Sequence, residues 1–143
     1  MTNDEKKEYL KSYRRAKAEA RSIEESIMEL RTNKMYPSIG DQDGMPHGSG
    51  GSDLSGYAAR LDELERRLQA KKWECINLYH QIMADIMAMP EATERTLLQY
   101  RYISGWTWER IALEMGITYR HVLRLHGKAL GNVKMSLNVT LKE

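Results

Sequence analysis

The sequence predicts an all-α protein in which a long helical hairpin or coiled-coil arm precedes a helix-turn-helix, with a short C-terminal β-strand as an option. Three observations predict this. Apolar residues recur every three or four positions over most of the first 89 residues, which is typical of a helical seam. A stretch rich in Gly and Pro over 35–53 interrupts that seam. From Pro90 onward the pattern changes to short helices with capping residues.

Length and composition exclude several classes of protein. A chain of 143 residues fits one domain, or one small domain with an extension. The single cysteine, Cys75, excludes an intrachain disulfide and fits a reducing cytoplasm. The N-terminus has no apolar segment typical of a signal peptide, and no apolar run approaches the ~18 residues of a membrane helix. We therefore expect a cytoplasmic protein.

The first helix is expected before residue 35. Its apolar residues follow one another at alternating spacings of 4 and 3, the repeat of a heptad seam, and charged residues flank them. The seam residues are Tyr9, Tyr13, Ala16, Ala20, Ile23, Ile27 and Leu30.

Residues 35–53 are expected to form a mobile loop, because such a segment cannot bury enough apolar surface to offset the entropy of ordering it. A phosphate-binding loop is the alternative. It is disfavoured because no strand precedes the segment and no Lys-Ser or Lys-Thr pair closes it.

A second long helix is expected over 54–88, with Ser52 or Asp53 as its N-cap. The heptad spacing continues if Lys71 occupies one core position. The other seam residues are Leu54, Tyr57, Leu61, Leu64, Leu68, Cys75, Leu78 and Ile82.

The two amphipathic helices must cover their apolar stripes to stay soluble. They can fold back on each other as an antiparallel hairpin, or each can pair with another protomer. At about 1.5 Å per residue the second helix is roughly 52 Å long, which favours an elongated arm with self-association through the seam. The arm is either a scaffold or a docking element for a partner.

The domain boundary is expected at Pro90, which breaks the second helix. Met83, Met87 and Met89 precede it and are expected to fill an irregular core at the junction, with a surface that adapts to partners as the alternative. The predicted parts are an arm over 1–89, a helix-turn-helix domain over 90–132 and a tail over 133–143.

Three helices are expected after the boundary. The first covers 90–103 and ends in a turn at Ser104 and Gly105. Thr107 can cap the second, which begins at Trp108 and stops at Gly116. Thr118 caps the third, which runs through Leu130 with Gly131 as its C-terminal stop.

Residues 108–127 match the spacing of a helix-turn-helix. The small Ala112 stands where the two helices nearly touch, Gly116 supplies the positive φ of the tight turn, and Val122 is the apolar residue that locks the second helix onto the first. A helical hairpin without a DNA-binding role is the alternative. Further apolar positions agree with the motif: Ile111, Met115, Ile117 and Leu125.

The charge of this part of the chain favours a polyanionic partner. The net charge of the whole chain is only +2, but residues 115–142 contain no acidic residue. Arg120 and Arg124 are four residues apart, so both point into a major groove that the helix enters, where an arginine can pair with guanine O6 and N7. A phosphate contact or a solvated charge is the alternative for each. The basic residues are Arg120, Arg124, Lys128, Lys134 and Lys142, with His121 and His126 beside them.

The residues predicted to contact DNA lie at the helix starts and on the outward face of the third helix. Thr118, Lys128 and the N-terminal amides suit phosphate, and Tyr119 suits a sugar or a thymine methyl. The complete set is Thr107, Thr118, Tyr119, Arg120, His121, Leu123, Arg124 and Lys128.

Residues 90–130 resemble region four of bacterial sigma factors, through the Pro-Glu start, LLQYRYISGWTWERIALEMGIT and the KAL at 128–130. The whole chain, including SDLSGYAARLDELE after the Gly-rich stretch, resembles the late transcriptional regulators of the ArpU and RinA type from temperate phages of Gram-positive bacteria. The resemblance implies a sequence-specific activator in the bacterial cytoplasm whose recognition helix, 118–130, lies in the major groove of double-stranded DNA. It also implies host RNA polymerase as a partner.

The tail alternates apolar and polar residues from Val133 to Lys142, the period of a β-strand. A lone strand must pair, and we expect it to pair with the same tail of another protomer. A helix end is the alternative, since Val133, Leu137 and Leu141 are also four apart.

No catalytic, metal or cofactor site is expected, so the protein is not predicted to be an enzyme. His121 and His126 are five apart and have no Cys or carboxylate near them in sequence. Cys75 has no adjacent His and is expected to pack in the seam.

Three functions therefore remain: a phage-type transcriptional regulator that acts as a homo-oligomer, the small terminase subunit of phage DNA packaging, and an oligomeric adaptor whose basic helix binds an acidic protein.

Overall fold

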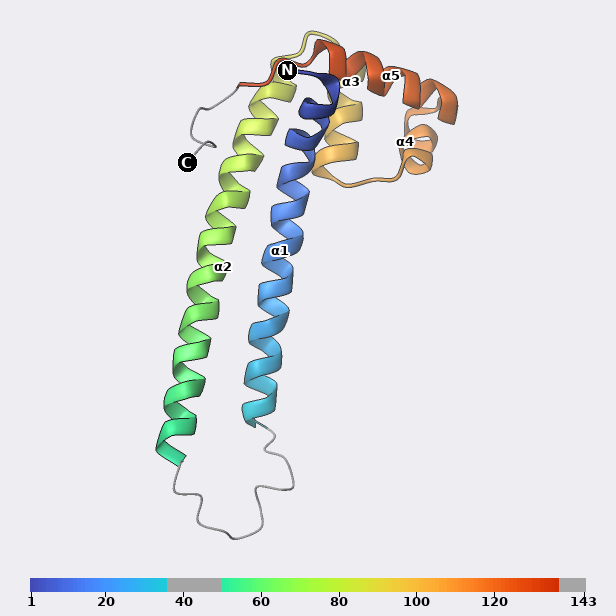
Figure 1. Cartoon of the computed structure of the whole chain (residues 1–143). Coiled ribbons are helices and arrows are strands. Elements are labelled where there is room, and N and C mark those ends of the chain that lie inside the picture. The colour runs from blue at the N-terminus through green and yellow to red at the C-terminus, as the bar shows by residue number, and fades with distance from the viewer. Residues whose placement is uncertain (36–49, 137–143) are drawn as a thin grey trace. The chain divides into compact units, whose positions relative to one another are not determined.

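The computed structural model describes residues 1–35 and 50–136 (Figure 1). Every regular element in these ranges is a helix, so the predicted all-α class is confirmed. In the same ranges no helix is both long and apolar enough to cross a membrane. The elements are α1 (Asn3–Met35), α2 (Gly50–Met87), α3 (Ala92–Leu98), the π-helix η2 (Gln99–Ile103), α4 (Trp108–Met115) and α5 (Tyr119–Asn132).

The chain divides into two compact units. Unit 1 combines residues 1–16 with residues from Glu74 onward, and unit 2 comprises Lys17–Trp73. Each long helix therefore contributes one end to each unit.

Unit 2 is an antiparallel helical hairpin. Three ion pairs join α1 to α2: Glu19 with Lys71 at 2.6 Å, Glu24 with Lys72 at 3.4 Å and Arg31 with Glu65 at 2.9 Å. Glu19 and Glu24, earlier in α1, pair with residues late in α2, whereas Arg31 near the end of α1 pairs with the earlier Glu65, as antiparallel helices require. Of the two predicted ways to cover the seam, the structure contains the hairpin within one chain. The buried seam residues of this unit are Ala20, Ile27 and Leu64.

Lys71 occupies a seam position, as the heptad spacing predicts. Its side chain is 24% exposed, and Glu19 supplies the opposite charge that a partly buried ammonium group requires.

The start of the second helix differs from the prediction. Because α2 begins at Gly50, neither Ser52 nor Asp53 is its N-cap, and Leu54 is exposed rather than buried in the seam. Of the predicted loop over 35–53, residues 36–49 lie outside the described residues.

One hydrophobic core joins the parts of unit 1. Leu10 of α1, which the seam prediction missed beside Tyr9, is fully buried in it. Of the three methionines expected at the junction, Met89 is buried, Met83 is half-buried and Met87 is 56% exposed. The largest fully buried side chains are Leu10, Ile82, Ile86, Leu97, Leu98, Ile111, Val122 and Val133.

The helix predicted over 90–103 consists of two elements. The α-helical α3 passes into η2, whose wider turn is visible in the bond from Ser104 N to Gln99 O at 2.9 Å. Leu98 and Tyr102 are both buried, so the wide turn still directs a side chain into the core on each side of the transition. Helical periodicity predicts one continuous helix because it does not report this tertiary packing, on which the wide turn depends.

Within unit 1, two cations of α1 donate hydrogen bonds to backbone carbonyl groups near the ends of α5 and η2. Lys6 Nζ donates to Leu130 O at 2.9 Å, near the end of α5, where carbonyl groups lack helical partners. Arg14 donates to Ile103 O at 3.2 Å, at the end of η2. Gly105 follows with φ 75°, and a Cβ there would lie on the Arg14 guanidinium.

The end of the chain differs in part from the prediction. Because α5 continues to Asn132, Gly131 lies inside the helix and is not its stop. Residues 133–136 have neither helical nor strand structure, and Ser136 donates to Asp85 through its backbone N at 3.1 Å and its hydroxyl at 2.7 Å. The rest of the predicted strand, 137–143, lies outside the described residues.

Candidate nucleic-acid interface

Helices α4 and α5 begin at the two threonines that the sequence indicates. The Thr107 hydroxyl accepts a hydrogen bond from Arg110 N at 3.2 Å, and the Thr118 hydroxyl accepts one from His121 N at 3.1 Å. Both predicted N-caps are confirmed. Each hydroxyl retains its own hydrogen for donation to another acceptor.

The turn between these helices has the predicted geometry. Gly116 has φ 68°, and Ile117 N donates to Ala112 O at 3.0 Å, which closes the end of α4. No atom lies within 4 Å of a Cβ built on Gly116, so the backbone conformation, not lack of space, requires glycine there.

Buried side chains hold α5 against α4 and α3. Ala112 is 7% exposed and Val122 is fully buried, as the helix-turn-helix spacing predicts. Ala129 is also fully buried, so buried side chains lie along the inward face of α5 from its first to its last turns. The opposite face of α5 is thereby presented to solvent.

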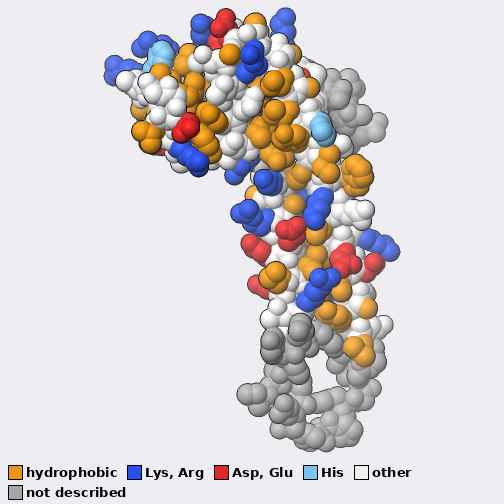
Figure 2. Space-filling model, turned by 180° about the vertical axis from the view of Figure 1, so that it is seen from behind, with side chains coloured by type: hydrophobic (Ala, Val, Ile, Leu, Met, Phe, Trp, Pro, Cys, Tyr) orange, Lys and Arg blue, Asp and Glu red, His pale blue; other side chains and the backbone are white. Residues whose placement is uncertain are grey.

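The solvent-facing side of α5 carries the predicted contact residues. Tyr119 is 47% exposed and Leu123 is 40% exposed, and His121 is half-buried. None of the three cations on this face forms an ion pair with another described residue. Those exposed cations are Arg120, Arg124 and Lys128. On the side seen in Figure 2, Lys and Arg side chains lie along the outer edge of unit 1.

Thr107 is the one predicted contact residue that lies neither in α5 nor at its N-cap. It lies at the start of α4, where backbone N–H groups without helical partners favour an anion. The structure therefore groups seven of the eight predicted residues on or immediately before α5 and places the eighth at the start of the neighbouring helix.

His126 does not belong to the basic surface, so the sequence interpretation that counted it there is wrong. It is buried, and its Nε2 lies 2.6 Å from the Tyr102 hydroxyl. Burial, together with the charges of Lys7, Arg101 and Lys11, lowers the pKa of His126 to about 4. The imidazole is therefore neutral near pH 7. Its partner Tyr102 is 24 residues away in sequence, which is why spacing gave no signal for this pair.

The buried imidazole predicts a specific dependence of stability on pH. Above about pH 6.5 His126 is neutral in both the folded and the unfolded chain. Between that pH and about 4 the unfolded chain binds a proton that the folded chain does not, so the free energy of unfolding falls as the pH falls. Urea denaturation from pH 7 to 4 should show this fall.

The variant His126→Gln keeps a group that can bond the Tyr102 hydroxyl but cannot titrate. Its free energy of unfolding should fall less than that of the unmodified chain over the same range. If the free energy of unfolding depends on pH in the same way in both chains, folding does not lower the pKa of His126.

Arginines stacked on tryptophans fix the start of α4. The Arg110 guanidinium lies 3.8 Å from the centre of the Trp106 ring, which stacks on Tyr100 at 4.2 Å, and Arg101 lies 4.1 Å from the Trp108 ring. Arg110 is exposed beside Thr107 and adds a cation that the sequence analysis missed. Its position in the first turn after a capped helix start is the signal that could have identified it.

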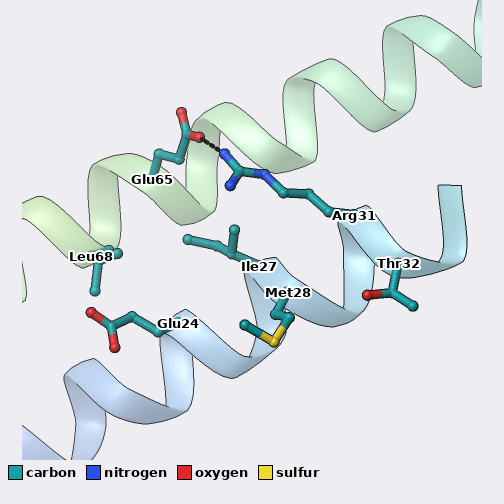
Figure 3. Close-up of a pocket in the computed structure, with 7 residues that line it drawn as sticks. All are labelled: Glu24, Ile27, Met28, Arg31, Thr32, Glu65 and Leu68. Atoms are coloured by element: carbon teal, nitrogen blue, oxygen red, sulfur yellow. Dashed lines mark hydrogen bonds and ion pairs between the residues drawn. The ribbon is translucent and has the colours of Figure 1, made fainter. Parts of the chain in front are cut away.

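Unit 2 contains a pocket of about 440 Å³ between α1 and α2 (Figure 3). The Arg31–Glu65 ion pair crosses it, and apolar side chains from both helices line it. In the described ranges no three His, Cys, Asp or Glu residues are grouped to hold a metal ion. The pocket is lined by Glu24, Ile27, Met28, Arg31, Thr32, Glu65 and Leu68.

Comparison with known protein families supports the helix-turn-helix interpretation. Residues 91–134 match the family model for sigma-70, region 4. This segment covers α3, η2, α4 and α5, and the match supports a DNA-binding helix-turn-helix there. The curated proteins and the solved structures compared with the chain gave no match.

Proposed function

We propose that the protein is a sequence-specific transcriptional regulator that inserts α5 into the major groove of double-stranded DNA. The observation that carries this proposal is the exposed cationic face of α5. Buried residues with helix-turn-helix spacing and two capped helix starts hold that face in position. The match of residues 91–134 to sigma-70 region 4 supports the same class of ligand.

The base contacts are assigned to the middle of the exposed face. Arg120 and Arg124 lie one helical turn apart and are both exposed, so each can pair with guanine O6 and N7. Leu123 lies between them and suits the methyl group of thymine. Tyr119 and His121 flank this set at the start of the helix.

The phosphate contacts are assigned to the helix starts and the end of the face. The hydroxyls of Thr107 and Thr118 stand beside unpaired backbone N–H groups, a combination that binds phosphate oxygens. Lys128 supplies a cation about three turns further along α5. Arg110 adds a second cation at the start of α4.

The biological setting of the proposal is a late-gene activator of a temperate phage that acts in the bacterial cytoplasm as a homo-oligomer. The resemblance of the chain to the ArpU and RinA type supports it, as does the presence of a helical hairpin in the same chain as the helix-turn-helix. Host RNA polymerase is the proposed protein partner, because region four belongs to a polymerase subunit.

Selection from a random duplex library tests the proposed function. The full chain should enrich one short motif, and its affinity for that duplex should fall steeply with salt because lysines and arginines displace counterions from phosphates. A promoter-reporter assay with the selected motif then separates gene regulation from binding to a packaging site. Absence of both enrichment and salt dependence would contradict the proposal and favour an adaptor that binds an acidic protein.

A further inference from the structure

Helix α2 carries a second apolar stripe that the fold does not use. The residues Ile76, His80, Met83 and Met87, which we call the α2 stripe, follow one another at spacings of 4, 3 and 4 within unit 1. Ile76 is 46% exposed and Met87 is 56% exposed, although both are large hydrophobic residues. His80 is exposed and Met83 is half-buried.

The α2 stripe is separate from the face of α2 that packs into the core. The core residues on α2 are Leu78, Ile82 and Ile86, all buried. At about 100° per residue the two sets are centred roughly 130° apart around the helix axis. Contacts within the chain cover the seam that the sequence predicts for self-association. Among the described residues the α2 stripe stays largely exposed, with Met83 half-buried and the Met87 sulfur accepting a hydrogen bond from Gln99 at 3.3 Å.

The α2 stripe lacks charge, which limits the partners that it fits. From Cys75 to Ala84 the sequence contains no Asp, Glu, Lys or Arg. The next charged residue, Asp85, is 7% exposed and accepts hydrogen bonds from Ser136. An acidic or basic partner would find no ion pair on this face, whereas charge-poor apolar surface is typical of the centre of an interface between identical chains.

We propose that the α2 stripe is the dimer interface and that its occupant is the same stripe of a second copy of this chain. A heptad spacing is covered best by a partner helix with the same spacing, and an identical helix provides it. A two-fold axis beside His80 brings the two His80 side chains together, where one imidazole can donate a hydrogen bond to the other. Tyr79, whose ring lies 5.6 Å from those of Tyr13 and His80, borders the stripe.

Dimerisation through this face gives two helix-turn-helix units in one particle. This consequence rests on the proposed function, because two such units fit two half-sites on DNA. The existence of the dimer does not depend on it.

Measurement of the mass of the full chain in solution, without DNA, tests the proposal. The unmodified chain should have twice the mass of one chain at micromolar concentration, and Ile76→Glu and Met87→Glu should each have the mass of one chain. The matched control is Leu113→Glu, which also places a carboxylate at an exposed hydrophobic residue, 84% exposed on α4, and should remain dimeric. Circular dichroism checks that all three variants keep their helix content.

Two results would overturn the proposal: a monomeric unmodified chain, which means that another segment or another protein covers the stripe, or an Ile76→Glu variant that stays dimeric. Binding to a duplex that contains one half-site tests the proposed function separately. A monomeric Ile76→Glu variant that still binds the half-site supports both inferences. An unmodified chain that is a dimer but binds no DNA contradicts only the proposed function.

Discussion

The variant Ile111→Ala is expected to lose about 2–5 kcal/mol of the free energy of unfolding, the usual cost of removing a large side chain from a packed core. Ile111 is fully buried in α4, and it belongs to the core that also contains Val122 of α5. Urea denaturation followed by circular dichroism measures the loss.

A matched variant lies two residues away on the same helix. Leu113 is 84% exposed, so Leu113→Ala should change the free energy of unfolding by no more than about 0.5 kcal/mol. The difference between the two variants tests which face of α4 is buried. Equal losses would mean that α4 does not pack as described.

The variants Arg120→Ala and Arg124→Ala should each weaken binding to the selected duplex by about 1–3 kcal/mol. Each guanidinium is exposed and has no ion-pair partner among the described residues, so its donors are available to a base. Loss of either arginine should also relax the preference at one base pair. Titrations of the selected duplex and of its single-base variants measure both effects.

Arg66→Ala is the control for a general loss of positive charge. Arg66 lies in unit 2, pairs with Asp62 at 3.1 Å and has an 81% exposed side chain, so its removal should leave DNA affinity unchanged. If Arg124→Ala loses as much affinity for random duplex as for the selected one, the side chain contacts phosphate and not a base.

The local features of the helix-turn-helix could be predicted from the sequence. The caps at Thr107 and Thr118 depend on bonds to residues three positions away, and the turn at Gly116 depends on its own φ. The burial of Ala112 and Val122 follows from spacing along two short helices. Each of these signals lies within a few residues, which is why reasoning from the sequence located the frame of the candidate site.

Features that depend on distant contacts could not be predicted. The heptad seam is the same whether the helices pair within one chain or between chains, and the ion pairs between α1 and α2 reveal the hairpin. The transition from α3 to η2 follows from tertiary packing, and the neutral state of His126 follows from its burial against Tyr102. Neither the wide turn nor the neutral imidazole could be predicted without the three-dimensional contacts.

Mapping of the DNA contact by NMR tests most directly whether the exposed face of α5 binds the duplex. A uniformly ¹⁵N-labelled chain is titrated with the selected duplex, and the backbone amide signals are followed. Signals from Tyr119 to Lys128, together with Thr107, should shift the most. Shifts that are concentrated elsewhere while the α5 signals stay unchanged would contradict the proposed interface.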